Sequence, residues 1–147
     1  MRNSWCYVKS KARGLLTAFF VVAAAALSAA DFAVVANKGS AESSVSRNDL
    51  KAMFLGEMTR WDDGKAVTIA VLNTGAVNAS FLQRVLGMTP AQFDTHWKKL
   101  VFTGKASAPK SFESAAALQE FVAGKPGAVG FVEVSQASGS VKTLTVK

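Results

Sequence analysis

The middle of the sequence alternates apolar runs of strand length with segments whose apolar residues recur at helical spacing. Residues 67–72 read VTIAVL, and they lead directly into a segment in which Val77, Phe81 and Val85 recur every four positions. A short apolar run indicates a buried strand, and the four-residue repeat indicates a helix. This alternation predicts an α/β domain in which helices cover a small mixed sheet.

The first thirty residues have a different character from the rest of the chain. Four basic residues precede an apolar stretch at 14–27, which is followed by the small residues Ser28, Ala29 and Ala30. This is the layout of a secretory signal peptide, and the stretch is shorter than the roughly 18 to 20 residues that span a membrane. We therefore expect residues 1–30 to be a signal peptide that is cleaved before Asp31.

Residues 31–147 have the length of one compact domain. They hold thirteen Lys and Arg and ten Asp and Glu, so their net charge is +3, whereas the whole chain carries +7. Cys6, the only cysteine, lies in the predicted leader, so the domain has no disulfide. Lys98 and Lys99 are best explained as part of a solvated helix face, and no nucleic acid is expected as a partner.

Capping signals and apolar stripes predict three more helices. Ser46 and Asp49 begin a helix that Gly56 ends, and Thr89, Pro90 and Gln92 begin another. The third lies in 114–127, where Gly124 and Pro126 end it. The expected buried stripes are Leu50, Met53 and Phe54 in the first helix, Phe93, Trp97, Leu100 and Val101 in the second, and Leu118, Phe121 and Val122 in the third.

Three further strands are expected at 31–37, 128–132 and 141–146, while 39–44 and 102–114 are expected to be loops. The predicted order of elements is therefore β, α, β, α, α, α, β, β. Trp61, Trp97 and the phenylalanines are expected to be core residues.

Little in residues 31–147 points to catalysis or to a metal. His96 is the only histidine, so neither a Ser-His-Asp triad nor a zinc site can be assembled convincingly. Asp62 and Asp63 supply too few ligands for a metal, and with Gly64 they are typical of a turn. We expect no enzyme activity, no metal and no cofactor.

The segment TGAVNAS at 74–80 is the one candidate for ligand binding. A strand that passes through Thr74 and Gly75 into a helix start points several backbone N–H groups the same way, and this favours an anion. Asn78 and Ser80 add potential side-chain donors. The alternative is that Thr74 only caps the helix.

Four ordered blocks of the sequence resemble one family. They read MFLGEMTRWDDG, TGAVNASFLQRVLG, HWKKLVFTGKASAPK and GKPGAVGFVEV. Together they resemble one lobe of the phosphate-binding protein of the high-affinity phosphate ABC transporter. The resemblance implies a single lobe of a type II periplasmic-binding-protein-like fold, periplasmic localisation, and binding of phosphate or a similar oxyanion for ABC-type uptake, with a transporter permease or another membrane protein as a possible partner.

The resemblance also implies an anion site at Thr74, Gly75, Ala76, Val77 and Asn78. Gly75 occupies a position that is commonly serine in the family, and Asn78 occupies a position that is commonly arginine. Arg60, Thr103 and Lys105 are secondary anion-binding candidates, with turn capping and surface hydration as their alternative roles. The alternative function is a ligand-free interaction or sensor-associated module built on the same lobe.

Overall fold

The computed structural model describes residues 31–73 and 75–147, so the predicted signal peptide and Thr74 lie outside the described residues. Its six-stranded sheet has the order β2-β6-β1-β5-β3-β4. β1 runs antiparallel to both of its neighbours, β5 and β6, whereas β3 runs parallel to β4 and β5. The strands are β1 (Phe32–Ala36), β2 (Ser44–Val45), β3 (Thr68–Leu72), β4 (Lys110–Phe112), β5 (Ala128–Glu133) and β6 (Lys142–Val146).

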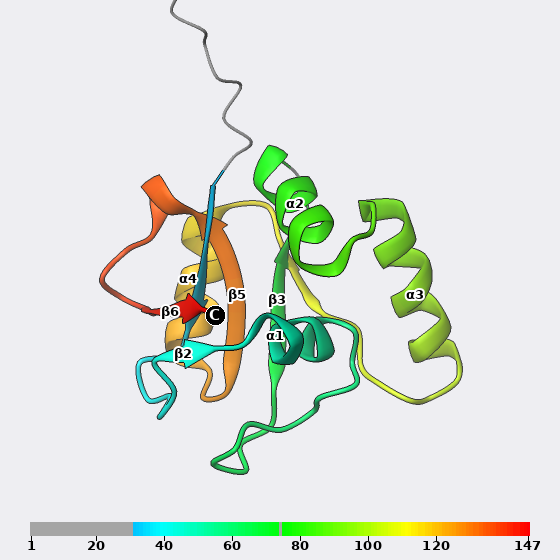
Figure 1. Cartoon of the computed structure of the whole chain (residues 1–147), viewed down its shortest axis with the longest axis horizontal. Coiled ribbons are helices and arrows are strands. Elements are labelled where there is room, and N and C mark those ends of the chain that lie inside the picture. Colours follow the sequence, from blue (N-terminus) through cyan, green and yellow to red (C-terminus); the bar gives the residue numbers. More distant parts are fainter. Residues whose placement is uncertain (1–30, 74) are drawn as a thin grey trace, which may run out of the picture.

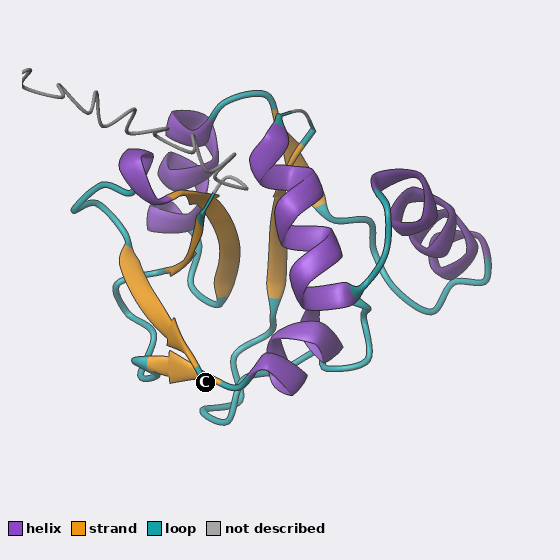
Figure 2. Cartoon of the chain, turned by 45° about the horizontal axis from the view of Figure 1, so that its top comes forward, coloured by secondary structure: helices purple, strands orange, loops and turns teal. Residues whose placement is uncertain are grey.

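Helices cover both faces of this sheet (Figures 1 and 2). They are α1 (Arg47–Phe54), α2 (Ala76–Phe81) with its π-helical continuation η1 (Leu82–Leu86), α3 (Pro90–Phe102) and α4 (Ala115–Gly124), and a short 3-10 turn, η2 (Val134–Gln136), follows β5. Phe81 of α2 stacks on Phe131 of β5 with ring centroids 4.0 Å apart, and Phe54 of α1 lies 4.7 Å from Phe81. α1 and α2 therefore share one face of the sheet.

α4 covers the opposite face. A Cβ atom on Gly130 of β5 would lie 2.9 Å from Leu118 of α4, and Phe112 of β4 packs against Phe121 with ring centroids 5.1 Å apart. Neighbouring residues of a strand point to opposite faces of the sheet. Phe131 therefore faces α1 and α2, whereas Gly130 faces α4. The predicted mixed sheet covered by helices is confirmed.

The caps form as the sequence predicts. Ser46 accepts a hydrogen bond from the N–H of Asp49, and Thr89 with Gln92 forms a complete capping box. Gly87 ends η1 in the left-handed conformation, with φ +72°. Trp61 and Trp97 are each 6% exposed, as expected for core residues.

Four local expectations are wrong. β2 begins at the last residue of the expected 39–44 loop, and β4 lies inside the expected 102–114 loop. β2 has two residues, and β4 is an edge strand whose first two residues are exposed, so neither shows the alternating burial that marks a strand. Val101 is 44% exposed instead of buried, and Phe102 is 93% exposed although the phenylalanines were expected in the core. Among the described residues, no helix is both long enough and apolar enough to cross a membrane.

Candidate functional site

The start of α2 lies at the edge of the sheet where β3, β4 and β5 end (Figure 1). Parallel strands bring their carboxyl ends to one edge, which is where open α/β sheets bind ligands. The N–H of Asn73, directly after β3, donates a hydrogen bond of 2.9 Å to the carbonyl oxygen of Phe112 at the end of β4. The helices that follow these two strands, α2 and α4, therefore begin at the same edge.

Gly75 is the N-cap residue of α2, and it leaves this helix start open. Its backbone has φ +100° and ψ 158°, and as a glycine it has no side chain that could cap the helix. Both Gly75 and Ala76 are exposed. A Cβ atom on Gly75 would meet nothing within 4 Å, but its φ is one that other residues rarely adopt. The space beside Gly75 is therefore open to a ligand, but a residue other than glycine would have a strained backbone at this position.

Asn78, at the position that is commonly arginine in the family, lines a small cavity. Asn78 is half-buried and lines a cavity of about 90 Å³ together with Asn73 and Asp94. The remaining lining is apolar and comes from Leu72, Leu82, Pro90 and Phe93. Because Asp94 brings a carboxylate to this cavity, the cavity itself favours a neutral or cationic group over an anion. The sequence analysis did not predict that Asp94 lines a cavity with Asn78.

The other members of the predicted site differ in exposure. Val77 is 7% exposed, so its side chain belongs to the core and only its backbone remains relevant to an anion. Ser80 is half-buried in the next turn. Thr74, the proposed capping residue, lies outside the described residues, and its alternative role as a simple cap stays a prediction.

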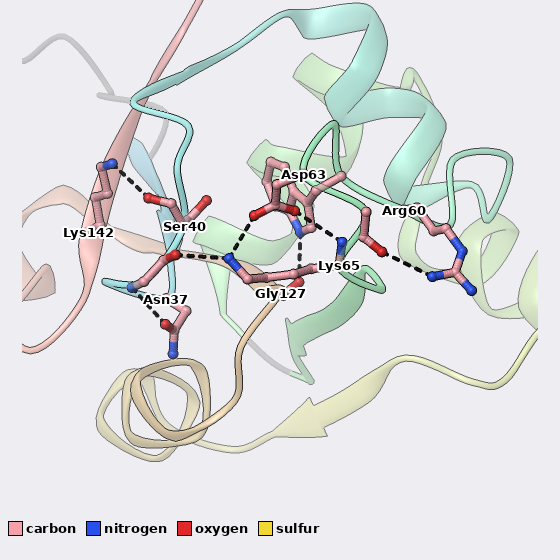
Figure 3. A network of polar contacts seen from close by, with 10 residues as sticks. Asn37, Ser40, Arg60, Asp63, Lys65, Gly127 and Lys142 are labelled. Carbon is pink, nitrogen blue, oxygen red and sulfur yellow. Dashed lines mark hydrogen bonds and ion pairs between the residues drawn. The ribbon is translucent and has the colours of Figure 1, made fainter.

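Arg60 is not brought to the start of α2. It pairs with Ala66 in an isolated bridge just before β3, at the opposite end of that strand from Asn73. Its guanidinium donates a 3.0 Å hydrogen bond to the carbonyl oxygen of Gly64 (Figure 3). This arrangement agrees with the alternative role of Arg60 in a turn.

Thr103 and Lys105 also lie away from the start of α2. The hydroxyl of Thr103 donates to the carbonyl oxygens of Lys99 and Leu100 at the end of α3, so it caps that helix. Lys105 lines a hollow of about 330 Å³ with Thr68 and Lys110, which are in the amino-terminal parts of β3 and β4. The structure therefore does not gather the secondary candidates into one site with Gly75 and Asn78.

Asp62 and Asp63 form the predicted turn. Asp63 accepts from the backbone N–H of Lys65 at 3.0 Å and forms an ion pair of 2.7 Å with the Lys65 ammonium (Figure 3). The side-chain hydrogen bond from Lys65 lowers the pKa of Asp63 below its ordinary value. Within the described ranges, no cluster of three or more potential metal-binding His, Cys, Asp or Glu side chains is present.

His96 has a structural contact that explains its position. Its Nε2 atom lies 2.8 Å from the carbonyl oxygen of Leu55, directly after α1. The neighbouring Trp97 donates its indole N–H to the carbonyl oxygen of Phe54 at 3.0 Å. Both side chains therefore hold α3 against the end of α1.

A groove between α3 and β4 was missed at the sequence level. It has a volume of about 520 Å³, and one face of α3 forms its first wall, with Phe93, Asp94, Trp97, Lys98, Val101 and Phe102. Ala108, Pro109 and Ser111 form the opposite wall. The available signal was Phe102, because at about 100° per residue it falls beyond Val101, the last residue of the predicted buried stripe.

Comparison with known proteins gives matches at the level of structure. No protein-family model matches the chain, and no curated protein matches it. An ABC-type phosphate transport receptor from Vibrio cholerae matches with a TM-score of 0.62 and 17% identity, over 78% of this chain and 45% of the receptor. A putative phosphate ABC transporter substrate-binding protein with bound phosphate from Clostridium perfringens matches with a TM-score of 0.60 and 14% identity, over 78% of this chain and 44% of that protein.

PstS from Borrelia burgdorferi matches with a TM-score of 0.57 and 11% identity, over 79% of this chain and 47% of PstS. The chain thus spans less than half the length of each of these structures. The fold that the four sequence blocks imply is confirmed: the chain has the α/β fold of a single lobe of phosphate ABC transporter substrate-binding proteins.

Proposed function

We propose that this chain is a single-lobe binding protein that holds phosphate or a related oxyanion at the start of α2, in connection with ABC-type uptake. The observation that carries the proposal is the open helix start at Gly75, on the carboxyl edge of a sheet whose fold matches phosphate receptors. The backbone N–H groups of Ala76, Val77 and Asn78 are the proposed donors, since helix starts attract anions. Thr74 is included in the proposed site from the sequence alone.

The proposed binding is weak in the isolated chain. Gly75 and Ala76 are exposed, so water and salt screen an anion held there. The neighbouring Asp94 carboxylate opposes an anion, and Asn78 supplies a neutral amide where the family commonly has a charged guanidinium. An affinity near the millimolar range, about 4 kcal/mol, is the expected order of magnitude. A second surface that covers the site would strengthen it.

The proposed setting is the periplasm, with the signal peptide removed and a transporter permease or another membrane protein as partner. A non-catalytic role is part of the proposal, because the matched structures are transport receptors and binding proteins by description. Arg60 contacts a turn, Thr103 caps the end of α3 and Lys105 lines another hollow, so the proposed anion site does not include them.

Amide chemical shifts test this proposal most directly. In a titration with phosphate, sulfate and molybdate, the amide signals of residues 75–78 should move in a saturable way, while those of the Asp62–Gly64 turn should not. Sodium chloride at matched ionic strength is the control, since a weak site needs high anion concentrations. At about 100 times Kd, stability should rise by roughly 2.7 kcal/mol. Shifts that chloride reproduces equally would contradict oxyanion binding.

The second candidate function is an interaction module that binds no small ligand. The specific observation in its favour is the exposed apolar surface at the end of α3, where Phe102 is 93% exposed and Val101 is 44% exposed. Apolar side chains that gather on a surface commonly mark a site of contact with another molecule. Absence of any saturable oxyanion response would favour this second function.

A further inference from the structure

The groove between α3 and β4 combines exposed apolar side chains with concave shape. Val101 and Phe102 are two of the three large apolar side chains that are exposed in the described part of the chain, and Val134 is the third. Both line the groove, and Trp97 and Phe93 line it with them. α3 lies at one side of the molecule in both views, away from the β1–β6 part of the sheet (Figures 1 and 2). The groove is therefore on the outside of the domain.

The charge of the domain is concentrated at the same place. Residues 94–110 hold four lysines and one aspartate, whereas the rest of 31–147 holds nine basic and nine acidic side chains. The whole net charge of +3 thus resides in α3 and the segment that follows it. Lys98 lines the groove, and Lys105 and Lys110 line the adjoining hollow, which shares Trp97, Ala108 and Pro109 with the groove.

Within residues 31–73 and 75–147, these lysines form no ion pair. The ion pairs of the described residues join Lys65 to Asp63 and Arg84 to Asp31, and neither involves Lys98, Lys105 or Lys110. Asp94 is the one acidic side chain among the residues that line the two hollows. The groove is therefore lined mainly by apolar side chains, and three lysines line it or the adjoining hollow. Its complement is an anionic segment that carries apolar side chains.

We propose that this groove binds an acidic segment of another protein, whose apolar side chains contact Trp97, Val101 and Phe102 and whose carboxylates lie near Lys98, Lys105 and Lys110. A second copy of this chain fits poorly, because it would bring two positive surfaces together. Pro109 and Lys110 at the β4 edge also disfavour strand-to-strand pairing. A bilayer fits less well than a segment, since the apolar side chains line a hollow between two walls.

The proposal is independent of oxyanion binding at the start of α2, and the two can fail separately. The probe is a set of short fluorescein-labelled synthetic peptides in which Glu or Asp alternates with Phe, Leu or Val. Peptides with Lys in place of the acidic residues serve as the charge control, and phosphatidylglycerol–phosphatidylcholine vesicles serve as the membrane control. Fluorescence polarisation measures binding to the whole chain, and the indole N–H signals of Trp97 and Trp61 report its location.

The acidic peptides should bind, shift the Trp97 signal and leave that of Trp61 unchanged. Phe102→Ser should weaken binding by roughly tenfold to a hundredfold, because the exposed ring supplies an apolar anchor. Lys98→Glu should weaken it by about fivefold, with the effect reduced at high salt. The matched controls are Val134→Ser, another exposed apolar side chain, and Lys51→Glu, another exposed helical lysine, and neither should change binding.

Phe102 is 93% exposed, so Phe102→Ser should not unfold the protein. Circular dichroism checks this, and the phosphate-induced amide shifts at residues 75–78 should be the same as in the parent chain. Equal binding of acidic and basic peptides would overturn the proposal, and so would no binding of any acidic peptide, binding to vesicles alone, or equal losses in the control variants.

Discussion

The indole N–H of Trp97 donates a 3.0 Å hydrogen bond to the carbonyl oxygen of Phe54, and the ring packs over Gly56 at the end of α1. The last carbonyl groups of a helix lack partners within the helix, so α1 is completed by a side chain from α3. His96 contributes in the same way at Leu55. The position of α3, and with it one wall of the groove, depends on this contact.

Gly56→Ala should therefore destabilise the fold. Gly56 has φ +77°, and a Cβ atom there would lie 3.1 Å from both Trp97 and Leu100. The combined cost of the backbone strain and the displaced ring is about 1 to 3 kcal/mol, measured by urea denaturation. Gly87→Ala is the matched control, because φ is +72° there but nothing lies within 4 Å of the added atom. Equal losses in the two variants would show that the packing contributes nothing.

Asn78→Arg should improve oxyanion binding only when Asp94 is also changed. Because Asp94 lines the same cavity, an arginine at position 78 would pair with its carboxylate. The double variant Asn78→Arg with Asp94→Asn removes that competitor, and a gain of up to roughly 1.5 to 3 kcal/mol is expected from a charge-assisted hydrogen bond. Calorimetry with phosphate compares the single and double variants. A larger gain in the single variant would contradict this account.

Gly75→Ser, the other change toward the family pattern, should cost stability. The side chain has space, but φ +100° is unfavourable for serine, with a cost of about 1 to 3 kcal/mol. The resemblance alone favoured serine here, and the backbone conformation argues against it. A thermal melt should show a lower Tm than that of Ala76→Ser, an exposed neighbour within the helix. An unchanged Tm would mean that the helix start adapts.

Asp63 and Lys65 provide a test by pH. Since Lys65 lowers the pKa of Asp63 in the folded state, the pair stabilises the protein above the unfolded pKa, and this contribution is lost as the pH falls through the lowered folded pKa. In Lys65→Met, the carboxyl signal of Asp63 should titrate at a higher pH than in the parent chain. Asp62 is the internal control in the same NMR titration. An unchanged Asp63 midpoint would contradict the role of Lys65.

The exported protein is predicted to begin at or within a residue or two of Asp31. The basic, apolar and small-residue regions of 1–30 support this prediction. N-terminal sequencing of protein recovered from the periplasm measures it. Recovery of a chain that retains Met1 in the membrane fraction would contradict both cleavage and periplasmic release.

Most of the fold was predictable because its signals are local. The Ser46 and Thr89 caps and the stripe of Val77, Phe81 and Val85 each specify an element from neighbouring residues alone. β4 was not predictable because it has three residues at the sheet edge. Its existence depends on pairing with β3, which lies far away in the sequence.

The candidate site was less predictable, because it depends on which loops meet. Arg60 and Lys105 belong to sequence blocks that resemble the family, yet the sheet places them toward the amino ends of β3 and β4. Nothing in the sequence indicated that Asp94 lies near Asn78, because the turn between η1 and α3 brings the two residues to the same cavity. Phe102 is a large apolar residue outside the buried stripe of α3, and this was the one feature of the sequence that indicated the groove.

The excess positive charge of the domain lies on the α3–β4 side. Long-range attraction acts on net charge and dipole before any contact forms, so anionic molecules are steered toward Lys98, Lys105 and Lys110. The start of α2 offers only the short-range field of backbone N–H groups, and Asp94 lines the cavity beside it. Encounter rates should therefore fall as ionic strength rises, and more steeply at the groove than at the helix start.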